Sequence, residues 1–489
     1  MYKEKTDTSS KSTESQFENH VAELLVDATL EEERRLVRKL DLRLIPFLAL
    51  LYLLSFLDRI NLGNAKLDTI ESDLNTTGAE FNWALSIFFI GYILFEVPSN
   101  VFLKIVGPRR WLPLVMIAWG TVMMAMSAVQ NATGLLIARF FLGVTESGLF
   151  PGIIFYLSLW YTRNEQTIRI SLFFAAATIS GAFGGVLAYG IIQMAGIQGL
   201  KGWQWIFILE GLPTILVAIV SYFYLPDFPE NSRFLNAREK LLCVSRLKKD
   251  GRQEGKVKFS WHQFFMVLKD WKIPMHMLIY ITTSIPLYSL SLFLPSIINQ
   301  LGFKDKLTAQ LMSAPPYVIA CLFCVLTAIS ADRNCERGLH VAIPSLVGCI
   351  GYILLVALQP YGAVSLYIAT IITTTGVFST VPAMLSWFTC NIGGQTKRAV
   401  ASAAIIAFGN IGGAIGGQIY REDDKASGYI RGHIICMSCL FVAFIACCLF
   451  KWLLIRENGR RDRLTPEEYA REAAGEDLCD WHPDFRYIS

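Results

Sequence analysis

The chain of 489 residues is too apolar for a soluble globular protein, since 53% of its residues are hydrophobic and only 17% are charged. Soluble domains carry about a quarter charged residues, and the mean hydropathy here is +0.42. The 44 Lys and Arg nearly balance the 40 Asp and Glu, so the chain lacks the strong positive field of a nucleic-acid binder. The composition predicts an integral membrane protein and argues against nucleic acid as a partner.

Twelve apolar spans follow one another along the chain, each long enough to cross a bilayer as a helix. Residues 1–42 are polar, mixed in charge and too long for a cleavable signal, so the first span is expected to stay. The expected spans are 43–64, 82–104, 111–130, 134–158, 168–192, 204–225, 273–299, 308–330, 339–358, 363–389, 399–420 and 431–454. The sequence thus predicts an all-α membrane protein with six-helix halves at 43–225 and 271–455, a polar central loop at 226–270 and a polar tail at 456–489.

Lys and Arg gather in the connections on one side of these spans, including the basic central loop. The connection over residues 65–80, on the other side, holds one Lys against four Asp and Glu. Cytoplasmic loops of membrane proteins retain an excess of Lys and Arg. We therefore expect both termini and the central loop in the cytosol, and the plasma membrane as the residence of the protein.

Four charged residues fall inside the first and fourth spans, where ionised side chains are costly and by default functional. With a rise of about 1.5 Å per residue, Asp58 and Arg59 lie roughly 22 Å from the cytosolic start of the first span. Arg139 of the fourth span lies at a similar depth, and Glu146 lies deeper. A guanidinium binds a carboxylate in a planar, bidentate manner, and a desolvated carboxyl group takes up a proton. These residue types predict one site that binds an organic anion and carries protons.

A structural role is the simplest alternative, in which Asp58 and Arg139 form an ion pair that holds the two spans together. Burying two arginines and two carboxylates for that purpose alone is usually less favourable than burying apolar residues of similar volume. Well inside the spans of the second half the polar groups are neutral, and most of them are expected to be ordinary helix contacts. Asn410 is the exception that we expect to touch a ligand, because neighbouring glycines permit close approach.

Two further acids lie inside spans, each shortly before a proline. Glu96 lies near the cytosolic end of the second span and Glu210 in the outer half of the sixth. Each is expected to hold a helix bend by accepting a bond from a freed backbone N–H, with gating as the alternative. The chain has no phosphate-binding loop, metalloprotease motif or nucleophile elbow, so we expect neither an enzyme nor a cofactor.

Four stretches carry a resemblance to a known family. They are LDRINLGNA at 57–65, EVPSNVFLKIVGPRRWLP at 96–113, ARFFLGVTESGLFPG at 138–152 and WQWIFILEGLP at 203–213. With them the chain resembles the major facilitator superfamily, and within it the anion:cation symporters, especially the fungal allantoate permease branch. The resemblance implies that Asp58 and Glu146 accept protons and that Arg59 and Arg139 bind substrate or gate. It also implies that Tyr92 and Asn410 line the cavity.

One loop departs from the pattern of that family. An acid is usual between the second and third spans, but this chain has Lys104 in its place. The contact that the acid makes is therefore expected to be absent or supplied elsewhere, with Glu96 as one candidate. The gating or structural residues expected from this loop and from its repeat in the second half are Arg109, Arg110, Asp332 and Arg333.

We therefore expect a proton-coupled importer of a small organic carboxylate that works as a monomer by alternating access of its two halves. The resemblance favours nicotinate, allantoate or a related anion, with vitamin acids such as pantothenate or biotin next. A nutrient receptor that binds the same anion without transporting it is a second hypothesis. A drug or sugar exporter is a third, and it predicts no dependence on Arg59.

Overall fold

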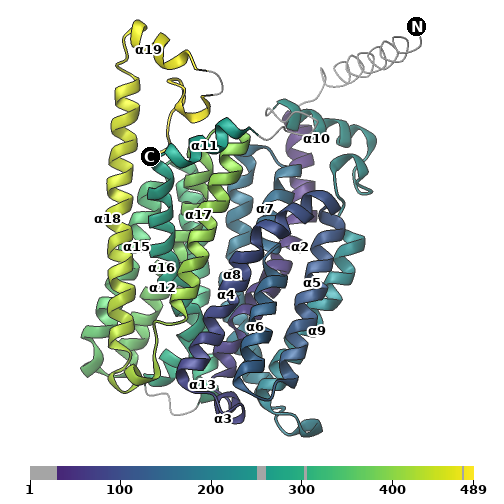
Figure 1. The fold of residues 1–489 in the computed structure, drawn as a ribbon, viewed down its shortest axis with the longest axis vertical. Helices are drawn as coiled ribbons and strands as arrows, with labels where there is room; N and C mark the ends of the chain where they lie inside the picture. Colours follow the sequence, from purple (N-terminus) through teal and green to yellow (C-terminus); the bar gives the residue numbers. More distant parts are fainter. Residues whose placement is uncertain (1–29, 250–259, 302–305, 476–477) are drawn as a thin grey trace.

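The computed structural model describes residues 30–249, 260–301, 306–475 and 478–489 (Figure 1). Most of the expected N-terminal tail and part of the central loop, at 1–29 and 250–259, lie outside the described residues. Within the described part, twelve helices are long and apolar enough to cross a membrane, which confirms the expected spans.

The spanning helices of the first half pack against one another in pairs. They are α2 (Leu30–Ala65), α4 (Gly78–Val106), α5 (Pro108–Ala125), α6 (Ala132–Glu146) continued by α7 (Leu149–Trp160), α8 (Arg163–Ile192) and α9 (Gly202–Tyr224). Within this half α2 packs on α8, α4 on α6 and α5 on α9. The fourth span is broken between Glu146 and Leu149. Gly148 lies at the break, where a Cβ atom would come within 2.0 Å of the Ser99 hydroxyl of α4.

The second half repeats this plan. Its spanning helices are α12 (Lys272–Gln300), α14 (Ala314–Arg333), α15 (Gly338–Ala357), α16 (Ala363–Asn391), α17 (Gln395–Gly416) and α18 (Ile430–Arg461). Here α15 packs on α16 and α18, and α12 packs on α17.

Short helices occupy the two ends of the bundle (Figure 1). They are α3 (Ile70–Asp73), α10 (Ala237–Lys249), α11 (Trp261–Lys269), α13 (Lys306–Leu311) and α19 (Pro466–Ala473). The 3-10 turns cover Met126–Ala128, Ile197–Gly199, Pro229–Asn231, Gln359–Tyr361, Glu422–Ser427 and Cys479–Trp481. We call the end that carries α10, α11 and α19 the tail end, and the end that carries α3 and α13 the far end.

The two halves meet through α8 with α14, α4 with α17 and α2 with α12. Toward the far end α2 and α12 touch backbone to backbone, since a Cβ atom on Gly63 would lie 2.1 Å from the Leu292 carbonyl oxygen. In the same region the Asn82 amide donates to the Tyr420 carbonyl oxygen at 3.1 Å, linking α4 to the second half. The halves are therefore closed against each other between the middle of the bundle and the far end.

Four buried charges lie at the tail end of the second half. The Lys272 and Lys397 ammonium groups each lie 2.7 to 2.9 Å from carboxylate oxygens of both Asp270 and Asp480. All four side chains are at most 3% exposed. We call these four residues the charge quartet; in it each cation has two anionic partners, and positive and negative charges balance.

Residues 478–489, which we call the tail strap, fold back onto the second half. Arg461 at the end of α18 donates to the carbonyl oxygens of Asp480 at 3.2 Å and Phe485 at 2.7 Å. The Trp387 indole and the Asn391 amide of α16 donate to the Ile488 carbonyl oxygen at 2.9 and 2.8 Å. The strap therefore joins α16 and α18 to the quartet residues of α12 and α17.

Candidate functional site

Arg59 and Glu146 form a buried ion pair in the first half. The Arg59 Nη2 atom lies 2.6 Å from Glu146 Oε1, and the two side chains are 5% and 0% exposed. The Ser55 hydroxyl, one turn earlier on α2, donates to the same carboxylate oxygen at 2.6 Å. Glu146 is the last residue of α6, a helix end that disfavours an acid because its carbonyl groups point outward. Arg59 and Ser55 supply the stabilisation that the helix end does not.

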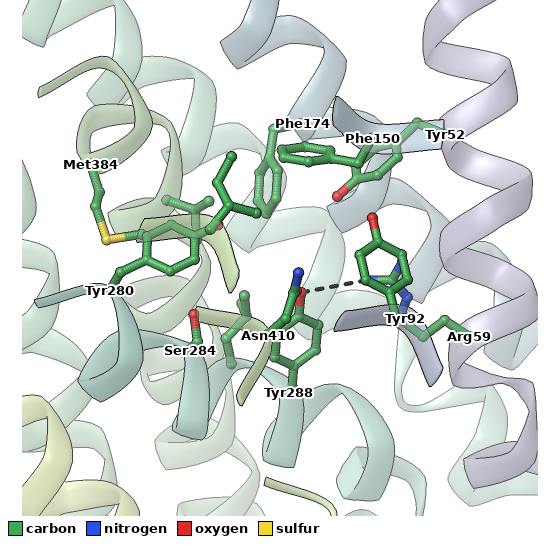
Figure 2. Close-up of a pocket in the computed structure, with 13 residues that line it drawn as sticks. Tyr52, Arg59, Tyr92, Phe150, Phe174, Tyr280, Ser284, Tyr288, Met384 and Asn410 are labelled. Carbon is green, nitrogen blue, oxygen red and sulfur yellow. Dashed lines mark hydrogen bonds between the residues drawn. The ribbon is translucent and has the colours of Figure 1, made fainter. Parts of the chain in front are cut away.

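Aromatic rings surround the Arg59 guanidinium. Its carbon atom lies 5.2 Å from the ring centres of both Phe88 and Tyr92 of α4. Across the interface, Nη1 donates to the Tyr288 hydroxyl of α12 at 3.4 Å (Figure 2). Rings that face a guanidinium attract it and also shield it from water. Arg59 thus contacts both halves while it is paired with Glu146.

A pocket lies beside Arg59, between the two halves (Figure 2). Its lining residues are Tyr52, Arg59, Tyr92, Phe150, Phe174, Tyr280, Ser284, Leu287, Tyr288, Val381, Met384, Ile406 and Asn410. The free cavity between them is small, about 20 Å³. Six of these described lining residues are aromatic, and Arg59 alone among them is charged. The pocket therefore offers an anion one guanidinium within an aromatic and largely apolar wall.

Two predicted cavity residues, Tyr92 and Asn410, line this pocket from opposite halves. The Asn410 amide of α17 also donates to Glu96 Oε2 of α4 at 3.2 Å. Helix α4 continues unbroken through Pro98. Glu96 thus has a partner across the interface, in place of the backbone contact that we expected at the proline.

Arg139 does not reach the pocket. It is buried, and it donates to two backbone carbonyl oxygens, those of Arg59 at 3.2 Å and Ala84 at 3.4 Å. Its Nη1 atom has no hydrogen-bond partner among the described residues. Arg139 therefore fixes the backbone of α2 at the residue that carries the pocket guanidinium.

Asp58 also faces away from the pocket, toward α5 and α9. Its Oδ2 atom accepts from the Trp119 indole at 3.0 Å and the Thr214 hydroxyl at 3.1 Å. Among the described residues it forms no ion pair with Arg139, so the structural clip considered from the sequence is wrong. Shared depth predicted that the two residues lie at one level, but their side chains point to different neighbours.

The loop residues lie at the tail end, apart from the pocket. The backbone N–H of Arg109 donates to Asp227 Oδ1 at 2.9 Å, so Asp227 supplies the acid that this loop lacks, and the suggestion of Glu96 was wrong. Asp332 pairs with Arg337 in the corresponding loop of the second half. Arg110 and Arg333 are exposed.

Most of the aromatic wall was missed from the sequence. Tyr52, Phe150, Phe174 and Tyr280 lie in apolar spans, where aromatic residues are common on every face. Only packing shows which of them turn toward the interface between the halves. The break after Glu146, which places Phe150 near Tyr52 with ring centres 5.4 Å apart, also had no clear signal.

Comparison with known proteins agrees with this fold. The sequence model described as Major Facilitator Superfamily matches residues 48–417. The chain is 38% identical to a protein of Fungal sp. (strain NRRL 50135) described as "MFS transporter prlL", over 92% of this chain and 91% of that one. It is 35% identical to a protein of Agrobacterium vitis described as "Putative tartrate transporter", over 87% of this chain and 97% of that one.

Solved structures share the fold at low sequence identity. A proton:xylose symporter, XylE, matches with a TM-score of 0.65 and 15% identity, over 83% of this chain and 95% of that one. A bacterial homologue of the lysosomal transporter Spinster, described as inward-facing and unoccupied, matches with a TM-score of 0.64 and 15% identity, over 86% of this chain and 98% of that one. The chain therefore belongs to the Major Facilitator Superfamily and is a multi-pass membrane transporter, not an enzyme.

Proposed function

We propose that the protein imports a small organic carboxylate together with protons by alternating access of its two halves. The observation that carries this proposal is the position of Arg59, the charged side chain of the pocket, within 2.6 Å of Glu146. A guanidinium held by one carboxylate is less available to another. Protonation of Glu146 weakens its hold and frees Arg59 for the carboxylate of the substrate, so anion binding and proton binding favour each other.

The cycle follows from this competition. From an acidic outer face, Glu146 takes up a proton and Arg59 binds the incoming carboxylate. After the halves rock, Glu146 loses its proton to the more alkaline side and pairs again with Arg59, which displaces the anion. The described arrangement, with the pair formed and the far end closed, fits the state after release if the tail end faces the cytosol, as the distribution of Lys and Arg predicts.

The aromatic wall favours a flat substrate. Stacking of a ring on Tyr52, Phe150 or Phe174 is worth about 0.5 to 1.5 kcal/mol per contact beyond the area buried. Among the anions that the family resemblance suggests, nicotinate best matches a pocket with one guanidinium and six aromatic residues. Allantoate, pantothenate and biotin come next, and the relative named for tartrate adds that small hydroxy acid to the candidates.

Uptake of labelled carboxylates tests the proposal in cells that lack their own carrier, at about pH 5 and about pH 7. We expect accumulation of nicotinate that is faster in acid. Glu146→Gln mimics the protonated acid, so it should still bind nicotinate but show weaker acid stimulation than wild type, whereas Arg59→Ala should lose binding. Acid stimulation as steep in Glu146→Gln as in wild type would contradict the proton role. Binding without accumulation would indicate a receptor, and uptake unaffected in Arg59→Ala would point to a different cargo.

A further inference from the structure

We propose that Asp58 and Glu210 form a carboxyl pair that binds one proton, as a second proton site outside the substrate pocket. The proposal rests on the proton coupling proposed above and adds a residue, Glu210, together with a site for it. It follows from the contacts of the two acids and from the charges that surround them.

The two acids are buried where α2 packs against α9. Asp58 is 1% exposed and Glu210 is 4% exposed. Thr214 connects them, since its hydroxyl oxygen lies 3.1 Å from Asp58 Oδ2 and 3.2 Å from the Glu210 carbonyl oxygen. The two carboxyl groups are near enough to interact electrostatically. A hydroxyl group has one proton, so Thr214 serves only one of these two oxygens at a time.

Most of the carboxyl oxygens in this pair lack a donor. Asp58 Oδ1 and both carboxyl oxygens of Glu210 are buried and have no hydrogen-bond partner among the described residues. The uncharged amide of Asn61 on α2 lies near enough to interact with the Glu210 carboxyl group, but without the geometry of a hydrogen bond. Burying an ionised carboxylate without partners is costly, and a carboxyl group in that position retains a proton instead.

The buried charges around the two acids balance only if the acids hold one proton between them. Asp58 interacts electrostatically with Glu146 and Arg139 of α6 and precedes Arg59 on α2, while α5 brings the uncharged Trp119. Arg59 and Glu146 neutralise each other. Arg139, which interacts with Asp58, is then the one cation of the set left to balance two carboxyl groups, and its Nη1 atom has no partner among the described residues. One proton shared by Asp58 and Glu210 makes the set neutral, as a sealed apolar interior requires.

The pair also has a route of influence on the pocket. Asp58 precedes Arg59 on α2, and Arg139 binds the backbone carbonyl oxygen of Arg59. When the pair gives up its proton, the new carboxylate and Arg139 attract each other more strongly, which pulls on the turn of α2 that carries Arg59. Uptake therefore responds to two titrating sites, Glu146 at the pocket and the pair behind it.

The test measures the initial rate of uptake of labelled nicotinate from about pH 4.5 to about pH 8 and takes the slope of its logarithm against pH. In wild type the uptake rate should rise with about the second power of the proton concentration. Glu210→Gln removes the neighbouring negative charge, so Asp58 loses affinity for its proton. The slope should fall to about the first power, with the midpoint about one pH unit more acid. Glu210→Asp keeps the acid and should keep the slope, and Glu80→Gln, an exposed cap of α4, is the matched carboxyl-to-amide control.

Each outcome decides between the claims. A wild-type slope and midpoint in Glu210→Gln would overturn the pair while leaving Glu146 as a proton site. Uptake in wild type without acid stimulation would overturn the proton coupling and the pair together. If Glu210→Gln does not reach the membrane, Asp58→Asn removes the other member and must flatten the profile in the same way; an unchanged slope there would equally refute the shared proton.

Discussion

Each ammonium group of the charge quartet lies within 2.9 Å of two carboxylates, whereas the buried charges of the first half are only partly paired. There, Arg59 and Glu146 form one close ion pair, and Arg139 binds backbone carbonyl oxygens instead of an acid. Asp58 and Glu210 keep three carboxyl oxygens without partners among the described residues. The quartet has equal numbers of cations and anions, and the first-half cluster has one acid too many.

The difference separates two uses of buried charge. A cluster that only holds helices together offsets its desolvation cost with complete pairing, because any unpaired charge in a dry interior is strongly unfavourable. A cluster that must release and accept protons or anions cannot be complete in every state. The incomplete pairing in the first half is thus what the proposed transport cycle requires, and the quartet shows what a static cluster looks like in the same chain.

The largest effect is expected from breaking the quartet. Asp480→Ala leaves Lys272 and Lys397 to share one carboxylate, so the free energy of unfolding should fall by about 3 to 5 kcal/mol. Denaturation of the purified protein in detergent measures it. Asp484→Ala, in the same strap but with its side chain 69% exposed, is the control and should change stability by less than about 1 kcal/mol. If the two variants lowered the free energy of unfolding equally, the quartet would not be a special source of stability.

A change at Arg59 should reduce transport more than stability. Arg59→Lys keeps the charge but loses the planar fork that meets Glu146 and, in the proposed function, the substrate. We expect uptake to fall about 100-fold, equivalent to about 2 to 3 kcal/mol, in initial-rate measurements. Arg431→Lys, 75% exposed at the start of α18, is the matched control. Normal uptake by Arg59→Lys would mean that a point charge suffices.

Acid should remove the stability that the quartet provides only at low pH. Burial raises the pKa of Asp270, but Lys272 and Lys397 outweigh it and hold that pKa below the usual value. A lowered pKa gives stability that is complete above the unfolded value, about 3.9, and is lost as the pH falls through the folded value. The melting temperature should therefore not respond to Asp270 between about pH 5 and pH 7, where uptake changes. If the melting temperature fell between about pH 7 and pH 5 in wild type but not in Asp480→Ala, the quartet would titrate in the same range as uptake. The static cluster and the transporting cluster could then not be told apart by pH.

The smallest effect is expected at an ion pair between the halves whose acid is open to solvent. Lys66 lies 3.6 Å from Glu422, whose side chain is 43% exposed. Exposed ion pairs are worth about 0 to 1 kcal/mol, so Glu422→Gln should change uptake by less than about fivefold. A large loss of uptake would show that this pair, and not the buried cluster, limits closure at the far end.

The sequence was sufficient for the spans and for the level of each membrane charge, because length, hydropathy and helical rise determine both. It was not sufficient for the partners. Arg139 and Asp58 lie at one depth, yet Arg139 turns to carbonyl oxygens and Asp58 to Trp119, since depth says nothing about which faces meet. The tail strap was also missed, because a short polar segment carries no periodicity that would mark it as packed.

The strap determines how the second half moves. It joins the ends of α12, α16, α17 and α18 through Arg461, Asn391 and the quartet. Separating any one of these helices at the tail end would expose buried ammonium groups, which is far more costly than tilting all four together. The second half should therefore move as a rigid body during transport. The helix bending that alternating access requires should occur in the first half, where the fourth span is already broken between α6 and α7 beside Glu146.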